Sequence, residues 1–245
     1  TRQLYMSGNA THMAATAVRN NILGRAQKHF EEDLDNLDLA NGKVFVKSDP
    51  SQSMSISDLA KICASEGIPL TNLAEFKAPF TEPPDPETGQ GDIWPDFTFG
   101  AHAVEVAVDT ETGVVTLLKS VACHDIGRAI NWAAAEGQIQ GGGAQGLGYA
   151  LMEDVIIDNG YLKARNFSEY LIPTSRDIPT TVPIILESGT GIGPFGSKGI
   201  GEPALTPAAP AVANAVANAI GARVFTLPLT PDRVLEAVER AKSQA

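Results

Sequence analysis

The strongest constraint on this chain comes from residues 191–205, whose sequence GIGPFGSKGIGEPAL surrounds a single carboxylate, Glu202, with glycines. Glycine is favoured where the backbone adopts positive φ or where another group approaches the main chain closely. Pro203 biases Glu202 toward an extended conformation. Thr206 followed by Pro207 predicts the start of a helix in the Ala/Val stretch beyond. We therefore expect Glu202 on a stiff loop that leads to a helix N-terminus. A glycine-rich connection with a solvated glutamate is the alternative.

A second unusual stretch, residues 132–152, has helix-forming flanks around glycines at 137, 141, 142, 143, 146 and 148. Each glycine inside a helix costs about 1 kcal/mol relative to alanine, so this helix is predicted to pack very closely on another backbone or on a ligand. Gln138, Gly142 and Gln145 share one face. Because each amide both donates and accepts, the two glutamines suit a flat ligand rich in heteroatoms. The alternative is a tight helix–helix contact in which neighbouring main chain satisfies them.

The remaining patterns predict an α+β fold with β-hairpins and packed helices. Apolar residues at helical spacing indicate an amphipathic helix over residues 9–30. Alternation over residues 97–109, returning over 114–122, indicates a hairpin with His102 on the same face as its valines. Shorter elements are expected as a strand at 41–48, a helix capped by Ser55 or Ser57 and ended by Gly67, a hairpin at 155–162, sheet segments at 170–173 and 182–186, a strand at 223–227, and a last helix from 230–231.

Residues 78–95 are rich in Pro, Gly, Asp and Thr and show no periodicity. A loop of this length is often functional or marks an interface. We expect either a long surface loop or the connection between two subdomains of a single domain that covers residues 1–245.

Composition narrows the class of function. The chain has 245 residues and a net charge of −11, which argues against nucleic acid or an anionic membrane as the main partner. No apolar run is long enough to span a bilayer and no signal peptide is visible. The two cysteines, Cys63 and Cys123, have no metal-binding spacing, and a reduced cytoplasmic setting is expected.

Several familiar motifs fail on context. Residues 191–196 and 141–146 both satisfy the spacing GxGxxG, but the first leads into another loop and the second lies inside a helical pattern rather than after a strand. Lys198 follows GS and precedes glycine, so it does not form a phosphate-binding P-loop. No GxSxG elbow supports a serine hydrolase. His124 beside Asp125 suggests a catalytic pair, although a hydrogen-bonded histidine at a strand end is favoured.

Four segments together resemble one family. They are GPFGSKGIGEPAL at 193–205, EGQIQGGGAQGLGYAL at 136–151, HDIGRAIN at 124–131 and the opening TRQLYMSGNA. They are similar to the C-terminal molybdenum-binding domain of the xanthine oxidase family, which includes xanthine dehydrogenases, aldehyde oxidoreductases and nicotinate dehydrogenases. The similarity runs in register over nearly the whole chain, to the closing LPLTPDRVLEAV.

The resemblance implies roles for particular residues. Glu202 stands where the family keeps its general base, which takes a proton from a metal-bound hydroxide as that oxygen attacks an electron-poor carbon and hydride passes to the Mo=S sulfur. Gln138 matches a glutamine beside the pterin ligands of molybdenum. Cofactor binding is further implied for Thr1, Arg2 and Gln3, which match a segment at the phosphate-bearing tail of the pterin, and for the backbone N–H groups of residues 196–199, with Lys198 supplying positive charge. No residue of this chain is expected to ligate the metal.

The resemblance also implies partners. The family's molybdenum subunit is far longer, so we expect this chain to pack on the other half of the molybdenum domain, together with a [2Fe–2S] subunit and a FAD-containing flavin subunit. The cofactor is molybdopterin or its cytosine dinucleotide form, and the substrate is an N-heterocycle of purine or nicotinate type, or an aldehyde. Because the chain opens on Thr1, a processed, split or separately encoded subunit is expected. A non-catalytic assembly subunit and a carbon monoxide dehydrogenase-type subunit are the alternatives; GEPAL favours the heterocycle and aldehyde branch over the latter.

Overall fold

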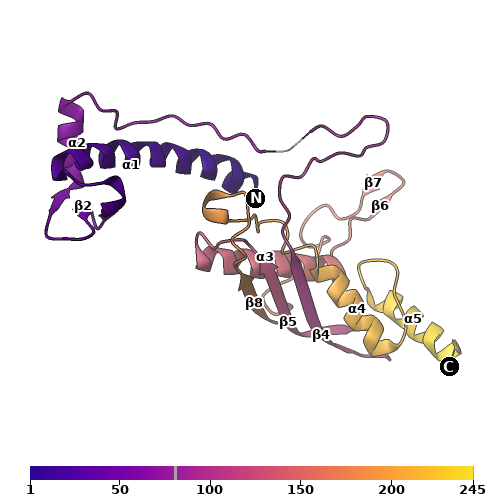
Figure 1. Cartoon of the computed structure of the whole chain (residues 1–245). Helices are drawn as coiled ribbons and strands as arrows, with labels where there is room; N and C mark the ends of the chain where they lie inside the picture. The colour runs from indigo at the N-terminus through magenta and orange to yellow at the C-terminus, as the bar shows by residue number, and fades with distance from the viewer. Residues whose placement is uncertain (80–81, 245) are drawn as a thin grey trace. The chain divides into compact units, whose positions relative to one another are not determined.

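The computed structural model describes residues 1–79 and 82–244 (Figure 1). The chain divides into two compact units: one comprises residues 2–79, and the other comprises Thr1 together with the chain from residue 80 onward. This division falls inside the loop expected at 78–95. None of the described helices combines the length and apolar character that crossing a membrane requires.

The unit of residues 2–79 is built on a long helix. A single π-helical turn, Leu4–Gly8, runs into α1, Asn9–Phe30. A short 3-10 turn, Leu34–Asn36, leads to an antiparallel sheet of β1 (Leu37–Ala40), β2 (Lys43–Val46) and β3 (Ser53–Ser55), in the order β1-β2-β3. Asn41 and Gly42 both have positive φ, as the two-residue turn between β1 and β2 requires. The helix α2, Ile56–Ser65, begins where the Ser55 side chain accepts from the Asp58 N–H, which confirms Ser55 as the cap.

The expected helix over residues 9–30 is confirmed, but it is amphipathic over only part of its length. Ile22, Leu23 and Ala26 are buried with residues of the sheet and of α2. Met13 in the first half is 46% exposed. The difference arises because, among the described residues of this unit, the packed apolar cluster includes residues of α1 only from Val18 onward.

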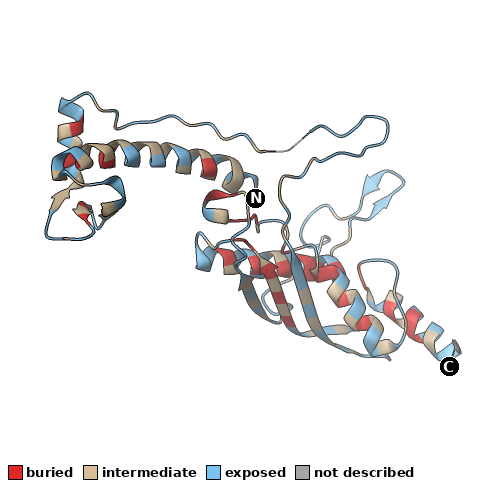
Figure 2. Cartoon of the chain, viewed as in Figure 1, coloured by how far each residue is buried: buried red, intermediate tan, exposed pale blue. Residues whose placement is uncertain are grey.

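The other unit is organised on a three-stranded sheet. Strands β4 (Gly100–Val108) and β5 (Val115–Asp125) form the predicted hairpin, and β8 (Thr180–Leu186) pairs with β5 in parallel, giving the order β4-β5-β8. Helices α3 (Trp132–Leu151) and α4 (Ala208–Ile220) pack on the sheet, and α5 (Pro231–Gln244) closes the chain (Figure 1). Buried residues gather along these helices and on β5 (Figure 2). The small hairpin of β6 (Ile157–Asp158) and β7 (Tyr161–Leu162) forms a sheet of its own.

Two predicted strands are wrong. Residues 170–173 and 223–227 form no ladder, although both are apolar. In the second segment the carbonyl of Arg223 accepts from the Arg240 guanidinium, and just beyond the segment the Leu229 N–H donates to the carbonyl of Ala150 on α3. Because these main-chain groups bond to helices, the segment connects α4 and α5 without joining the sheet. Phe225 within it is 86% exposed.

Candidate functional site

The glycine-rich loop, residues 188–198, follows β8 and is folded tightly on itself. The Gly191 N–H donates to the Gly196 carbonyl at 3.0 Å, and the Gly193 N–H donates to the Ser197 carbonyl at 3.0 Å. A Cβ added to Gly193 would lie 2.5 Å from that Ser197 oxygen, a separation that side chains do not tolerate. Phe195 within the loop has a positive φ of 60°, and Gly196 has one of 81°. The glycines therefore serve close backbone approach inside the loop.

This folding uses most of the loop's N–H groups. The N–H of Gly196 donates to the Gly193 carbonyl, that of Ser197 to the Pro194 carbonyl, and that of Lys198 to the Ile126 carbonyl, at 3.0, 3.2 and 2.7 Å. The resemblance implied that these N–H groups lie near the cofactor. In the structure all three donate to carbonyl groups of this chain, two within the loop and one at Ile126 after β5. The role implied for Gly199 stays a prediction.

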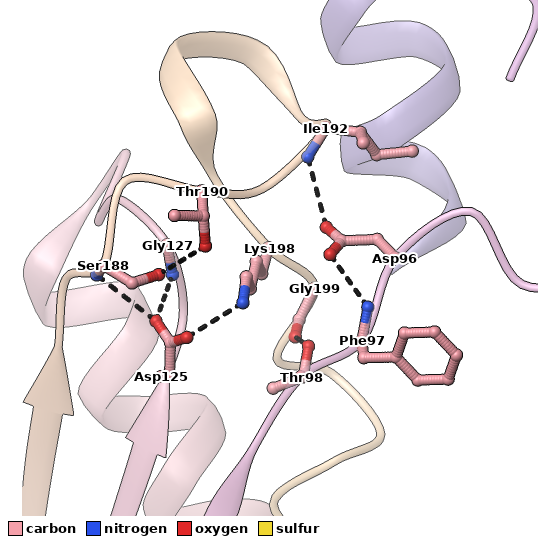
Figure 3. A network of polar contacts seen from close by, with 10 residues as sticks. All are labelled: Asp96, Phe97, Thr98, Asp125, Gly127, Ser188, Thr190, Ile192, Lys198 and Gly199. Atoms are coloured by element: carbon pink, nitrogen blue, oxygen red, sulfur yellow. Dashed lines mark hydrogen bonds and ion pairs between the residues drawn. The ribbon is translucent and has the colours of Figure 1, made fainter. Parts of the chain in front are cut away.

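Asp125 at the end of β5 and Lys198 in the loop form a buried ion pair (Figure 3). The Lys198 Nζ lies 2.9 Å from Asp125 Oδ2, and the two side chains are 5% and 13% exposed. Burial opposes ionisation of Asp125, but hydrogen bonds from Lys198, Gly127 and Ser188 outweigh it and lower the pKa of the carboxyl to about 2. The ammonium also lies 5.4 Å from the centre of the Phe99 ring. Lys198 therefore has partners within this chain, and its implied contact with the cofactor stays a prediction.

Helix α3 meets the segment that follows Glu202 at its glycines. A Cβ added to Gly142 would lie 2.6 Å from the Ala204 Cβ, and one added to Gly146 would lie 2.5 Å from the Ala208 Cβ. The predicted close packing of this helix on another backbone is confirmed. Asn131 caps the helix, since its side chain accepts from the Ala134 N–H.

This packing brings two of the predicted site residues together. A Cβ added to Gly201 would lie 3.5 Å from the Gln138 Oε1 atom, so the glutamine side chain lies beside the residue that precedes Glu202. Both Glu202 and Gln138 are exposed, as is Gln145 on the same face of α3. Glu202 lies in a run of turns that begins at Gly201, and its carbonyl accepts from the Leu205 N–H at 3.2 Å.

Helix α4 starts later than predicted. It begins at Ala208, with Pro207 before it and no side-chain cap. Thr206 is not the cap because the N–H of Ala208 donates to the carbonyl of Leu205, at 3.2 Å, and so already has a partner. Gly221, with a φ of 73°, ends the helix as expected.

The remaining predicted cofactor residues divide between the units. Thr1 contacts Gly199, whose missing side chain leaves room for the Thr1 side chain, and the Gly199 carbonyl accepts from the Thr98 hydroxyl at 2.9 Å. Arg2 and Gln3 are exposed helical residues of the other unit, immediately before its π-helical turn. Gln138, Gly199, Thr1 and Glu202 therefore belong to one unit, whereas Arg2 and Gln3 do not.

A pair of histidines beneath the site was not predicted. His102 on β4 and His124 on β5 meet through their Nε2 atoms at 3.0 Å, with the rings edge to face. His124 therefore pairs with His102 rather than with Asp125, which faces Lys198. Burial lowers the pKa of His102 to about 4, with a further contribution from His124, and burial also lowers the pKa of His124. The alternation of exposed and less exposed residues along β4 places His102 on the inward face of the sheet, and this alternation was the sequence signal that could have predicted its burial.

The donor set of the site is polar but does not form a metal cage. Within residues 1–79 and 82–244, no three His, Cys, Asp or Glu side chains are grouped so that they could hold a metal ion. The site instead offers the Glu202 carboxylate, the Gln138 amide and the main chain of Gly201, which carries no side chain. Such a set can accept a proton and hydrogen-bond a heteroatom-rich ligand.

The chain is similar to known proteins over most of its length. Residues 1–179 match the molybdopterin cofactor-binding domain family. The xanthine dehydrogenase molybdenum-binding subunit of Escherichia coli O157:H7 is 32% identical over 241 residues, which are 96% of this chain and 30% of that protein. The nicotine 6-hydroxylase large subunit of Paenarthrobacter nicotinovorans is 31% identical over 242 residues, 97% of this chain and 29% of that protein.

A solved structure agrees with these sequence relatives. Quinoline 2-oxidoreductase from Pseudomonas putida 86 superposes with a TM-score of 0.80 at 29% identity, over 97% of this chain and 30% of that chain. The chain thus spans about three tenths of the length of the relatives it matches. The α+β fold expected from the sequence and the family expected from the resemblance are both confirmed. The chain belongs to the molybdopterin cofactor-binding domain family.

Proposed function

We propose that this chain is the part of a molybdenum hydroxylase that carries the general base, Glu202, and one side of the cofactor site. The observation that supports this most is the position of Gly201, the residue before Glu202, beside the Gln138 amide. The residue before the carboxylate lies against the glutamine amide of α3, and the two side chains are exposed on the same unit. A carboxylate can accept a proton, and an amide can both donate and accept hydrogen bonds, which are the roles that this proposal gives to the two side chains.

The residues present fit a pterin that brings its own metal. Gln138 offers both a donor and an acceptor to pterin heteroatoms, and Gly201, which has no side chain, leaves the main chain beside it open to close approach. Thr1, beside Gly199, would extend the same surface, and the contacts implied for Arg2 and Gln3 with the phosphate-bearing tail stay predictions. Because the described residues provide no cluster of metal ligands, the molybdenum would be held by the pterin rather than by this chain.

Glu202 acts in this proposal by accepting a proton at its carboxylate. When bound, the molybdenum–pterin group supplies the two-electron oxidation. The main chain on both sides of Glu202 is anchored: the Gly199 carbonyl accepts from Thr98 before it, and Ala204 packs on Gly142 after it. A base carried on an anchored main chain is positioned in part before the reaction begins, and this contributes to rate.

The substrate and the partners follow from the relatives. Two of them are named for nicotine and quinoline, which are N-heterocycles, and we infer oxidative hydroxylation of an electron-poor carbon in an N-heterocycle or an aldehyde, with water as the oxygen source. Since this chain spans about three tenths of such proteins, the other half of the molybdenum domain completes the site. The [2Fe–2S] and FAD groups reside on further chains or domains and carry the electrons away. A cytoplasmic location belongs to the same proposal.

The test is made on the native assembly that contains this chain. Metal analysis is expected to give about one molybdenum and one pterin per chain. Incubation with purine, nicotinate and aldehyde substrates in ¹⁸O-labelled water, with an artificial electron acceptor, should place ¹⁸O in the product of at least one of them. An assembly without molybdenum, or a product whose new oxygen does not come from water, would contradict the proposal.

A further inference from the structure

The Asp125 carboxylate joins three segments of the chain at one point (Figure 3). Its Oδ2 atom accepts from Lys198 Nζ at 2.9 Å, while Oδ1 accepts from the N–H groups of Gly127 and Ser188 at 3.0 and 3.3 Å. Ser188 follows β8 and Lys198 ends the glycine-rich loop. Both ends of that loop are therefore attached to the same side chain at the end of β5.

The loop between these two ends is stiff. Its carbonyls and N–H groups bond to one another, and the Gly189 N–H donates to the Gly127 carbonyl at 2.8 Å. Outside the loop, Asp96 accepts from the Ile192 N–H at 3.2 Å. Because the main chain of the loop is hydrogen-bonded internally, we expect a displacement of Lys198 to move the whole loop as a rigid unit.

Only three residues separate Lys198 from Glu202, and they are held as well. Thr98 bonds to the Gly199 carbonyl, and Gly201 lies beside Gln138. Beyond Glu202, Ala204 packs on Gly142. Among these anchors, the Asp125–Lys198 pair is the charged and buried one. Removal of one partner from a buried pair leaves an uncompensated charge, whereas an apolar replacement of both is often tolerated for stability.

We propose that the Asp125–Lys198 ion pair is a positioning device for Glu202, an inference that rests on the proposed function of that carboxylate. Lys198 acts through the main chain of residues 199–201 and does not need to touch the cofactor. The pair fixes the register of the glycine-rich loop on the end of β5, and the loop in turn fixes where the base is presented. The geometry favours this role over direct cofactor binding, because the ammonium already has a carboxylate and an aromatic ring as partners.

The test compares Lys198→Met, Asp125→Asn and the double variant in the assembled, molybdenum-loaded complex. Methionine keeps an unbranched stem without the charge. Turnover per bound molybdenum is expected to fall by about 10- to 100-fold, as a small misplacement of a reacting group does, while the KM for substrate stays within about threefold and molybdenum content is retained. The double variant, which leaves no unpaired buried charge, should assemble well and still show the lowered kcat. If Lys198→Met does not assemble, the kcat of the double variant is compared with that of the unaltered complex instead.

Two controls separate the explanations. Lys163→Met breaks an exposed pair with Asp158 at 3.0 Å and should leave kcat unchanged. Glu202→Gln is measured in parallel: normal turnover in that variant would overturn the proposed function itself. If Glu202→Gln is inactive but all Asp125 and Lys198 variants keep kcat within twofold, only the positioning role is overturned. Loss of molybdenum with unchanged kcat per remaining metal would overturn it too, and would make Lys198 a cofactor-binding residue.

Discussion

His102 and His124 approach each other through their Nε2 atoms at 3.0 Å on adjacent strands beneath α3. One ring must donate and the other accept, so the pair holds a single proton between its two Nε2 atoms. Among the described residues, neither Nδ1 atom has a hydrogen-bond partner. Adding a second proton would place two N–H groups against each other in a buried site. The fold therefore favours the neutral pair.

The first prediction concerns stability in acid. The pKa of His102 is lowered to about 4 in the folded chain from a reference of 6.5, so the unfolded state binds more protons between these values. Stability should consequently fall as the pH drops from 6.5 to about 4, by up to about 3 kcal/mol from this residue. Denaturant unfolding at several pH values measures this slope. In His102→Phe, which keeps a ring but cannot titrate, the slope should be much smaller.

Asp125 contributes in a separate window, because its lowered pKa of about 2 makes its contribution fall only below about pH 3.8. A slope between pH 6.5 and 4 that is identical in His102→Phe would contradict the assignment.

The second prediction concerns two neighbouring glycines of α3. Gly142→Ala should destabilise the chain by about 1–3 kcal/mol, because the new methyl group would lie 2.6 Å from the Ala204 Cβ and would force the two backbones apart. Gly141→Ala has nothing within 4 Å of its new methyl group and should stabilise the chain by about 0.5–1 kcal/mol through helix propensity. Thermal unfolding of the two variants checks the opposite signs. Equal effects would argue against the packing described here.

How much of this could be read from the sequence depended on whether the cause was local. The limits of α1 and the β4–β5 hairpin follow from periodicity and turn residues, and the sequence predicted them; for the cap of α2 the sequence left Ser55 and Ser57 open, and the structure selects Ser55. The packing of Gly142 was predictable as a close contact because a helix accepts so many glycines only for such a reason. Its partner, Ala204, was not predictable, because that contact joins residues 62 positions apart.

The predictions that differ from the structure fail because they depend on contacts between residues far apart in the sequence. Residues 223–227 have the composition of a strand, but their main chain bonds to helices, which no local pattern reveals. Lys198 is a lone basic residue in a glycine-rich loop and suggests a ligand for an anion; its actual partner, Asp125, lies 73 positions earlier. The family resemblance implied the roles of Glu202 and Gln138, and the fold places Gly201, the residue before Glu202, beside the Gln138 side chain.

The third prediction concerns the glutamine of α3. Gln138→Ala should weaken retention of the pterin by about 2- to 10-fold, the loss expected for one hydrogen-bonding side chain. Gln140→Ala removes an exposed glutamine from another face of the same helix and should have no effect. Molybdenum and pterin content after extended dialysis of the complex measures the difference. Equal retention in both variants would remove Gln138 from the cofactor site.

The most direct test of the whole account is turnover in Glu202→Gln. Glutamine keeps the size and hydrogen-bonding capacity of the side chain but cannot accept the proton. In the assembled complex, molybdenum content should match that of the unaltered protein, while kcat per molybdenum falls by at least about 100-fold, as loss of a general base does. Turnover within a few-fold of normal in a fully loaded Glu202→Gln complex would contradict the central claim.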